Sequence, residues 1–245
     1  MNSLSTFQSG DLRVEFLHAF QPIVDVSSRC IYAYEALLRS PSGQGPVDVI
    51  RSVPKQYYSA LDQTIRETAL ARASALGVSC RLSLNMSSSC MIQDQNYLLK
   101  TIDYAEQCGI AAQNVVIEIS ESDVIHGIPR LNDRLNEAHA RGALIALDDF
   151  GAGYAGLNSL IDVNPDIIKL DMYLIRNIDS SGPRQATIKA LVGLALDLGI
   201  DLIAEGVETA EEYAFLTRAG IDMFQGYFFA KPQLCQLVGM DDVNC

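Results

Sequence analysis

Residues 144–149 read LIALDD, an apolar run that stops on two adjacent aspartates, Asp148 and Asp149. Such a run is typical of a buried parallel strand, because helices cover both faces of a parallel sheet. Four more runs end on an amide, an amine or a carboxylate in the same way: RLSLN (81–85), NVVIE (114–118), DIIKLD (166–171) and DLIAE (201–205). In a closed α/β barrel the active site lies at the carboxyl ends of the strands. The polar residues at these ends are therefore candidates for catalysis rather than for stability.

The segments around these runs alternate between strand-like and helix-like patterns. Two β-rich stretches come first, EFLHAFQPIVDV (15–26) and CIYAYEALLRS (30–40), and the short link between them predicts an antiparallel hairpin. The predicted strands that follow fall near 81–86, 114–119, 144–149, 166–171, 201–206 and 223–229. The predicted helices fall near 57–76, 96–108, 128–141, 184–199 and 209–219. Gly142, Gly199 and Gly220 lie where three of these helices should end.

Eight strands with intervening helices predict a closed α/β barrel. Alternating segments favour right-handed parallel crossovers, and eight strands close a barrel. An open doubly wound sheet is the alternative, but it would gather its site at one switch point, and no G-x-G-x-x-G follows the first strand. The length of 245 residues suits one barrel. We expect residues 1–14 to be a loose N-terminal lead-in and residues 15–245 to form a single barrel domain.

Charge and cysteine content narrow the class of partner and the compartment. The 18 Lys plus Arg against 30 Asp plus Glu give a net charge of −12, so the chain lacks a general attraction for DNA, RNA or an anionic membrane. The six cysteines form no C-x-x-C pair, which favours apolar fillers in a reducing compartment. The N-terminus lacks a signal-peptide pattern, and LVGLALDLGI (191–200) is too short to span a bilayer. We expect a soluble cytoplasmic protein.

Acidic residues at the predicted strand ends point to a bound cation. These acids are Glu35, Glu118, Asp148, Asp149 and Glu205. Two like charges about 4 Å apart repel by roughly 4 kcal/mol at an effective dielectric near 20, so converging acids must be protonated or neutralised by cations. With the amide of Asn85 they offer oxygen ligands, which suit Mg²⁺ or Mn²⁺ and argue against zinc. The adjacent Asp148 and Asp149 favour a two-metal site. One such acid alone would more often be a solvated strand end or a helix N-cap.

Lys169 lies within the apolar run IIKLD. Buried beside metal ions, its ammonium group could orient an attacking water or lower the pKa of that water. A structural ion pair with Asp171 is one alternative. Schiff-base chemistry is another, although the surrounding acids disfavour the neutral amine that it requires.

Three further polar residues lie in the first two and the last of the predicted strands. Arg39 ends the YEALLR segment and could bind a phosphate through two hydrogen bonds, although a surface salt bridge fits equally well. Gln21 and Gln225, in the first and last predicted strands, could contact a base edge or a water, or could be satisfied amides at the barrel end.

The segment DDFGAGYAGLNSL (148–160) contains Gly151, Gly153 and Gly156 at short intervals. This spacing favours a mobile loop over the site, and a plain flexible connection is the alternative. Glu121, three residues after Glu118, is placed to accept hydrogen bonds from this loop and to hold it.

Taken together, these residues resemble the EAL-domain family of bacterial cyclic di-GMP phosphodiesterases. Eight blocks carry the resemblance in order: FQPIVD (20–25), YEALLR (34–39), LNMS (84–87), IEISES (117–122), DDFGAGY (148–154), IKLD (168–171), IAEGVE (203–208) and QGYFFAKP (225–232). They cover nearly the whole chain, from about residue 15 to 233, which makes the resemblance specific. It implies a TIM-like (β/α)₈ barrel whose first strand runs antiparallel to the others, in agreement with the predicted hairpin.

The resemblance also implies a set of metal ligands. Glu35, Asn85, Glu118 and Asp148 look like the ligands of one Mg²⁺ or Mn²⁺ ion. Asp148 would bridge to a second ion, which Asp149 would also hold.

Other matching positions imply roles in catalysis and substrate binding. Lys169 and Glu205 resemble the residues that position and activate the hydrolytic water, and Gln225 resembles the glutamine near that water. Glu121 resembles a loop-anchoring glutamate. Three positions match substrate-contacting residues of the family: Gln21, Leu37 and Arg39.

The activity implied is hydrolysis of cyclic di-GMP to linear pGpG in bacterial second-messenger signalling, through a water activated by two metal ions. A catalytically silent module that binds cyclic di-GMP or docks a partner protein is the alternative. A metal-dependent barrel lyase or isomerase would fit the acids but not the eight blocks. The resemblance further implies a homodimer and leaves room for an upstream sensory domain in a longer parent chain.

Two segments depart from the family pattern. The loop reads FGAGYAGL where many active members have FGTGYSSL, so hydroxyl groups that could order the loop are missing. The stretch SPSGQGPVDVI (40–50) is shorter than in many relatives. We expect these departures to bear on metal affinity, regulation or the rim of the substrate site.

Overall fold

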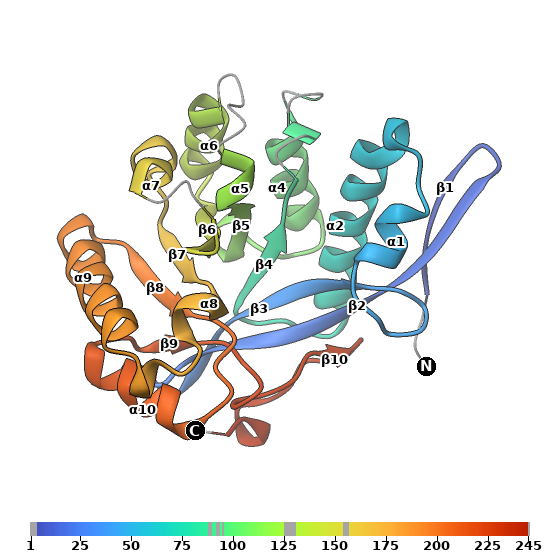
Figure 1. The fold of residues 1–245 in the computed structure, drawn as a ribbon. Helices are drawn as coiled ribbons and strands as arrows, with labels where there is room; N and C mark the ends of the chain where they lie inside the picture. The colour runs from blue at the N-terminus through green and yellow to red at the C-terminus, as the bar shows by residue number, and fades with distance from the viewer. Residues whose placement is uncertain are drawn as a thin grey trace.

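The computed structural model describes residues 4–244 apart from 88–89, 92–93, 95, 125–130 and 154–156. Within these residues, strands β2 to β9 follow one another around a barrel that β2 closes by pairing with β9 (Figure 1). β2 (Leu12–Asp25) runs antiparallel to β3 (Cys30–Arg39) and to β9 (Met223–Phe224). The pairs from β3 to β9 are parallel. The predicted TIM-like barrel with an antiparallel first strand is therefore confirmed.

The remaining barrel strands agree with the predicted segments to within a few residues. They are β4 (Arg81–Asn85), β5 (Val115–Ser120), β6 (Leu144–Phe150), β7 (Ile167–Leu170) and β8 (Asp201–Ala204). The last predicted strand, 223–229, is wrong beyond Phe224. A Cβ at Gly226 would lie 2.1 Å from the carbonyl oxygen of Val207, so the chain packs directly against that backbone and turns. The Ala230 amide then bonds to the Gly226 carbonyl instead of continuing a ladder.

Five long helices in the described part of the chain lie outside the barrel (Figure 1). They are α2 (Tyr58–Ala75), α4 (Tyr97–Gln107), α6 (Leu131–Ala140), α9 (Gly182–Leu198) and α10 (Ala210–Ala219). Gly142, Gly199 and Gly220 have φ of 96°, 70° and 102°, so each predicted helix stop has the left-handed conformation that ends a helix. The part of the predicted helix 128–141 before Leu131 lies outside the described residues.

Several short elements were not predicted. The helical ones are α1 (Val47–Arg51), α5 (Glu121–Val124), α7 (Leu157–Val163), α8 (Met172–Ile175) and the 3₁₀ turns Lys55–Tyr57, Ala112–Asn114, Ile178–Ser180 and Met240–Asp242. The strands are β1 (Ser5–Ser9) and β10 (Gln233–Leu234), and both pair with β2. Each is too short for hydrophobic periodicity to reveal it.

The amino-terminal segment differs from the expected loose lead-in. β1 and the start of β2 form a hairpin that extends from one side of the barrel (Figure 1). Phe7 on β1 and Val14 and Phe16 on β2 are buried in a small core separate from the main one, together with Val49 of α1 and Leu61 of α2. This alternate burial of apolar side chains fixes the segment in place.

The inside of the barrel holds an apolar layer near the amino ends of its strands. The members of this layer are Ile23, Ala33, Val116, Ala146, Ile167 and Ile203. It closes the barrel interior at that end, and the side chains two positions further along each parallel strand form a polar layer at the carboxyl ends. Among the residues that the structure describes, no helix combines the length and apolar character needed to cross a bilayer.

Candidate active site

The polar layer follows from the period of two in a β-strand. The residues two positions after the apolar layer on the parallel strands are Glu35, Glu118, Asp148, Lys169 and Glu205. Residues i and i+2 point to the same face, so all five side chains enter the barrel above the apolar layer. On the antiparallel β2 the corresponding position is two residues before Ile23, which is Gln21. The strand ends that the sequence singled out therefore meet at one mouth.

Lys169 lies at the centre of this layer and is almost fully buried. Its Nζ is 2.6 Å from Glu118 Oε1, 2.7 Å from Glu205 Oε1, 3.2 Å from Asp148 Oδ1 and 3.6 Å from Glu35 Oε2. Burial alone would lower the pKa of Lys169, but the surrounding carboxylates, Asp148 first, raise it well above its usual value. The side chain is therefore an ammonium ion, which disfavours Schiff-base chemistry.

The alternative ion pair between Lys169 and Asp171 is wrong. β7 ends at Leu170, and Asp171 is the N-cap residue of α8, where its side chain accepts a hydrogen bond from the Tyr173 amide. The change from strand to helix at this point takes Asp171 out of the alternation that brings Lys169 into the barrel.

Glu118 is the most enclosed of the acids. Its Oε1 accepts hydrogen bonds from Ser83 Oγ at 2.6 Å and from Lys169 Nζ at 2.6 Å, whereas its buried Oε2 has no partner among the described residues. Burial, and then the charge of Glu35, raises the pKa of Glu118. A buried carboxylate oxygen without a partner is unfavourable unless something positive occupies the adjacent space.

Ser83 is a site residue that the sequence reasoning missed. It lies on β4 two residues before Asn85 and is buried. In the sheet register it lies between Glu35 of the polar layer on β3 and Val116 of the apolar layer on β5. A lone hydroxyl at an inward position of the RLSLN strand was the available signal.

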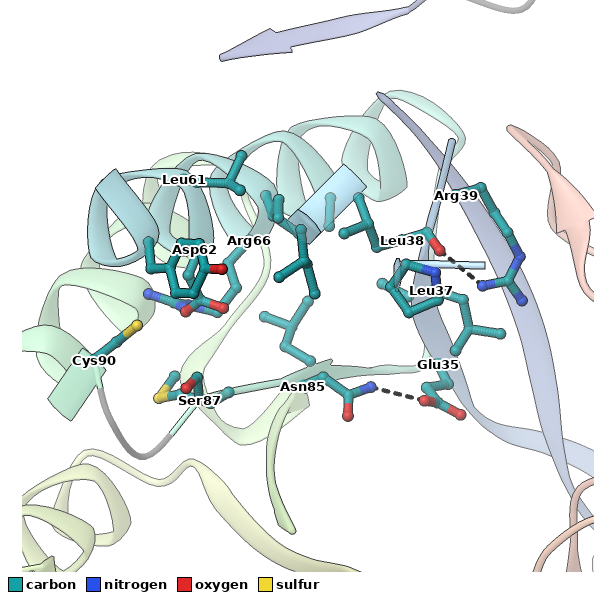
Figure 2. A pocket seen from close by; sticks show the side chains of 18 of the residues that line it. Glu35, Leu37, Leu38, Arg39, Leu61, Asp62, Arg66, Asn85, Ser87 and Cys90 are labelled. Carbon is teal, nitrogen blue, oxygen red and sulfur yellow. Dashed lines mark hydrogen bonds and ion pairs between the residues drawn. The ribbon is translucent and has the colours of Figure 1, made fainter. Parts of the chain in front are cut away.

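Glu35 is held by two amides. Asn85 Nδ2 donates to its Oε1 at 2.8 Å, as Figure 2 shows, and Gln225 Nε2 donates to its Oε2 at 2.7 Å. Burial would raise the pKa of Glu35, but Lys169 and the two amides together lower it below its usual value. Because Asn85 uses its amino group on Glu35, its carbonyl oxygen remains available as a ligand.

Gln21 and Gln225 are linked across the closing seam of the barrel. Gln225 Nε2 donates to Gln21 Oε1 at 3.3 Å, and Gln21 Nε2 donates to the Ala230 carbonyl at 3.1 Å. The interpretation of Gln21 as a satisfied barrel-end amide therefore has support. Gln225 differs, because its buried Oε1 has no partner among the described residues.

Asp148, Asp149 and Glu205 form a second acidic group, in which ligand oxygens lie within 4.8 Å of one another. Successive strand residues normally point to opposite faces. Here the β6–β7 register shifts between Leu147 and Phe150, and Asp149 has φ of 56°, so the irregular backbone brings Asp149 close to Asp148 and Glu205. Burial, and then the charges of Asp148 and Asp171, raises the pKa of Asp149 to about 6.

Glu121 contacts the loop that follows these aspartates. The Gly151 amide donates to Glu121 Oε2 at 2.9 Å, and a Cβ at Gly153 would lie 3.8 Å from the same oxygen. The hydrogen bond from this loop to Glu121 is thus present. Gly156, the third glycine of the predicted loop, lies outside the described residues.

Two cavities flank Glu35. The larger has a volume of about 560 Å³ and includes Leu37, Arg39 and Asn85 in its lining, and the smaller, of about 340 Å³, includes Gln21, Asp149, Glu205 and Gln225. Arg39 Nη1 donates to its neighbour's carbonyl, Leu38 O, at 2.8 Å (Figure 2). The ion pairs within the described part of the chain do not include Arg39, so the alternative of a surface salt bridge has no support there.

The far wall of the larger cavity carries a second polar group that the sequence reasoning missed. Arg66 and Tyr97 both donate hydrogen bonds to Asp62 of α2, and Arg66 Nε also donates to Thr101 Oγ1 at 3.0 Å. Figure 2 shows Asp62 and Arg66 together at the opposite end from Glu35 and Asn85. The available signal was the polar pair four residues apart in the predicted helix 57–76.

The residues present fit a hard divalent cation. Four carboxylates share the single ammonium of Lys169, which leaves three negative charges if all are ionised. The potential donor atoms are carboxylate and amide oxygens, the type that Mg²⁺ and Mn²⁺ prefer. The unpartnered Oε2 of Glu118 and the cluster of Asp148, Asp149 and Glu205 are two places where such an ion would find ligands.

Fold and site together define a class of protein, the (β/α)₈ barrels with a buried group of acids at the carboxyl mouth. Within that class the chain belongs to the EAL domain family, whose model matches residues 4–232. The chain is 34% identical over 218 residues to the blue light- and temperature-regulated antirepressor BluF of Escherichia coli, an alignment that covers 88% of this chain and 54% of BluF. It is 32% identical over 223 residues to the cyclic di-GMP phosphodiesterase PA2567 of Pseudomonas aeruginosa, which covers 88% of this chain and 38% of that protein.

A solved structure resembles the whole fold. Klebsiella pneumoniae BlrP1, as a manganese/cy-diGMP complex, superposes with a TM-score of 0.87 at 32% sequence identity, covering 96% of this chain and 60% of that one. The chain therefore spans little more than half the length of BluF and of BlrP1, and less of PA2567.

Proposed function

We propose that this protein hydrolyses one phosphodiester of cyclic di-GMP and releases linear pGpG. The single observation that carries the proposal is the Lys169 ammonium within 3.6 Å of four carboxylates, beside a Glu118 oxygen that lacks a partner in the described residues. This arrangement suits cations and a phosphate substrate in an otherwise acidic protein. The PA2567 relative, named a cyclic di-GMP phosphodiesterase, supports the choice of substrate.

We assign cation binding to five residues at the mouth: Glu35, Asn85, Glu118, Asp148 and Asp149. Two Mg²⁺ or Mn²⁺ ions held there would neutralise charge on the scissile phosphate and lower the pKa of the attacking water. Manganese in the BlrP1 complex supports a divalent ion.

Three residues act on the attacking water and the phosphate. The Glu205 carboxylate accepts the proton that the water loses, and the Gln225 Oε1, which has no partner in the described residues, accepts a hydrogen bond from that water. Lys169 holds Glu205 at 2.7 Å and adds positive charge near the phosphate. The water oxygen bonds to phosphorus while the bond from phosphorus to the 3′ oxygen breaks. That oxygen takes up a proton from solvent and leaves as a 3′ hydroxyl, and the product keeps a 5′ phosphate.

The two cavities on either side of Glu35 suit a substrate with two similar halves. Each cavity would take one guanylate half, with the scissile phosphate between them. Arg39 and Leu37 then contact the half in the larger cavity, and Gln21 contacts the half in the smaller one. Glu121 keeps the loop after Asp149 in place over the site.

Product analysis tests this proposal. Purified protein incubated with cyclic di-GMP and Mg²⁺ or Mn²⁺ should yield pGpG on anion-exchange chromatography, and excess EDTA should stop the reaction. Intact cyclic di-GMP after incubation with folded, cation-saturated protein would contradict the proposal.

A silent module that docks a partner protein is the second candidate, because the relative BluF is named an antirepressor. Binding of cyclic di-GMP that is independent of divalent cations, without any linear product, would favour it. Its weakness is that no position of the proposed ligand set is substituted in this chain.

We further propose that the barrel is a single cytoplasmic domain that works as a homodimer, with a sensory domain upstream in a longer parent chain. The five cysteines that the structure describes form no disulfide with one another, as in a reducing compartment. Ile161 of α7 is 79% exposed and Tyr173 of α8 is 65% exposed, and these apolar side chains suit contact with a second copy. Light scattering should give a dimer for the wild type and a monomer for Ile161→Glu. A monomeric wild type would contradict the proposed homodimer.

A further inference from the structure

Helix α8 packs against two glycines, Gly151 and Gly206, which follow the acidic ends of β6 and β8. We call the spaces beside these glycines the glycine notches. Gly151 comes two residues after Asp149, and Gly206 directly follows Glu205. A Cβ at Gly151 would lie 2.4 Å from Leu174 Cδ1, and a Cβ at Gly206 would lie 2.6 Å from Met172 Cβ. The end of the Leu174 side chain therefore fills the space that a side chain at Gly151 would need, and the Cβ of Met172 fills the space at Gly206.

The backbone around α8 is tied to the same two strand ends. The Asp171 amide donates to the Phe150 carbonyl at 3.1 Å, and the Glu205 amide donates to the Leu170 carbonyl at 3.1 Å. α8 thus begins between the segment that carries Asp149 and the segment that carries Glu205. It cannot shift without moving one of them.

The other faces of α8 contact different parts of the protein. Ile175 is fully buried in the main core, and Arg184 of α9 donates from Nε to the Tyr173 carbonyl at 3.0 Å. These two contacts hold the helix on its other sides. Met172 and Leu174 therefore stay packed in the glycine notches.

We propose that Met172 and Leu174 are positioning residues that set the distance between the Asp148–Asp149 pair and Glu205, and so the affinity of this group for a divalent cation. Neither side chain would touch the cation, and because Met172 also lines the smaller cavity, the proposal is tested without nucleotide. Asp149 has φ of 56° in an irregular strand end, a conformation that needs support from its surroundings. Leu174 against Gly151 and Met172 against Gly206 supply that support on the two sides of the acidic group. The inference depends on one part of the proposed function, namely that this acidic group binds a cation.

Titration with Mn²⁺ in the absence of nucleotide, followed by electron paramagnetic resonance of the free ion, tests the proposal. Leu174→Ala removes the Cγ and Cδ1 atoms beside Gly151, and Met172→Gly removes the Cβ beside Gly206. Each should weaken Mn²⁺ binding by about tenfold, the lower range for loss of a group that supports metal ligands. Met172→Ala keeps that Cβ and should bind Mn²⁺ with close to wild-type affinity. Leu174→Met and Met172→Leu, which keep the volume, should bind Mn²⁺ with close to wild-type affinity. Leu174→Val, a smaller change, should give an intermediate loss and serves if Leu174→Ala does not fold.

Ile175→Val is the matched control, because it shortens an apolar side chain on the same helix that faces away from the notches. It should lower the melting temperature and leave Mn²⁺ affinity unchanged. Weakening by Ile175→Val equal to that by Leu174→Ala, or unchanged affinity in Leu174→Ala and Met172→Gly, would overturn the proposal. A wild type that binds Mn²⁺ tightly without cleaving cyclic di-GMP would contradict the proposed function alone. A wild type that binds no Mn²⁺ would overturn both.

Discussion

The Ser83 hydroxyl donates a hydrogen bond of 2.6 Å to Glu118 Oε1 from the neighbouring strand, inside the barrel and out of contact with solvent. Lys169 contacts the same oxygen, whereas the other carboxylate oxygen of Glu118 is buried and has no partner in the described residues. A buried carboxylate that is anchored through one oxygen presents the other in a fixed direction. Ser83 thus orients a proposed cation ligand without touching the cation.

We expect Ser83→Ala to weaken Mn²⁺ binding by about tenfold or more, because Glu118 loses the hydrogen bond that fixes its rotation. Isothermal titration without substrate measures this directly. Ser74→Ala is a suitable control, because Ser74 donates to the Cys108 carbonyl far from the site. Unchanged Mn²⁺ affinity in Ser83→Ala would show that Glu118 needs no such support.

Lys169→Met should reduce stability strongly when no divalent cation is present. The change leaves Glu35, Glu118, Asp148 and Glu205 without their buried positive partner, and breaking a buried ion pair from one side costs about 3–5 kcal/mol. Urea unfolding in EDTA measures the loss, and Mn²⁺ should restore part of it because ligand binding stabilises the folded state.

The exposed Lys55→Met variant is the control for Lys169→Met and should unfold like the wild type. A Lys169→Met protein as stable as the wild type in EDTA would mean that the four acids are protonated in the folded state rather than paired with the ammonium.

Asp148→Asn should abolish turnover while preserving the fold. The amide is nearly isosteric but removes the negative charge that a shared cation ligand needs. We expect at least a thousandfold lower kcat at saturating Mn²⁺, with an unchanged circular dichroism spectrum, and the same result for Glu35→Ala. Asp103→Asn, on the surface of α4, should keep full activity. Substantial turnover by Asp148→Asn would refute its assignment as a ligand.

His18 should make the folded state sensitive to acid. Burial, and then the charge of Arg72, lowers the pKa of His18 from 6.5 to about 4, while its Nε2 lies 2.9 Å from Thr68 Oγ1. Between these values the unfolded chain binds a proton that the folded chain does not. The contribution of His18 to the free energy of unfolding is therefore complete above pH 6.5. It is lost as the pH falls toward 4, by about 3 kcal/mol in all.

Urea unfolding at pH 7.5 and pH 4.5 tests the role of His18. The free energy of unfolding of His18→Gln should fall between these conditions by about 2–3 kcal/mol less than that of the wild type. An equal fall in both proteins would contradict the lowered pKa.

The barrel and most of its mouth could be predicted because one repeated pattern encodes both. Each apolar run that ends on Glu118, Asp148 or Glu205 predicts both a buried strand and a site residue within one short stretch of sequence. The glycine stops at Gly199 and Gly220 were equally visible, because a left-handed residue after a helix favours glycine.

The parts that sequence reasoning missed depend on contacts between distant segments. Ser83 reads as an ordinary strand residue until Glu118 lies beside it, 35 positions away. α8 is a four-residue helix whose place depends on Gly151 and Gly206, and no periodicity of its own reveals it. The interpretation of Lys169 as a partner of Asp171 was wrong. The strand ends between these two residues, so their side chains do not point to the same face.

The central claim is that the acids around Lys169 bind a pair of divalent cations, and anomalous diffraction from crystals grown with Mn²⁺ and a non-hydrolysable cyclic di-GMP analogue tests it most directly. Maps calculated at the manganese edge should contain two peaks about 3.5–4 Å apart, one beside Glu118 and Asp148 and the other beside Asp148 and Asp149. Maps with the nucleotide analogue bound and no anomalous peak among these side chains would contradict the account.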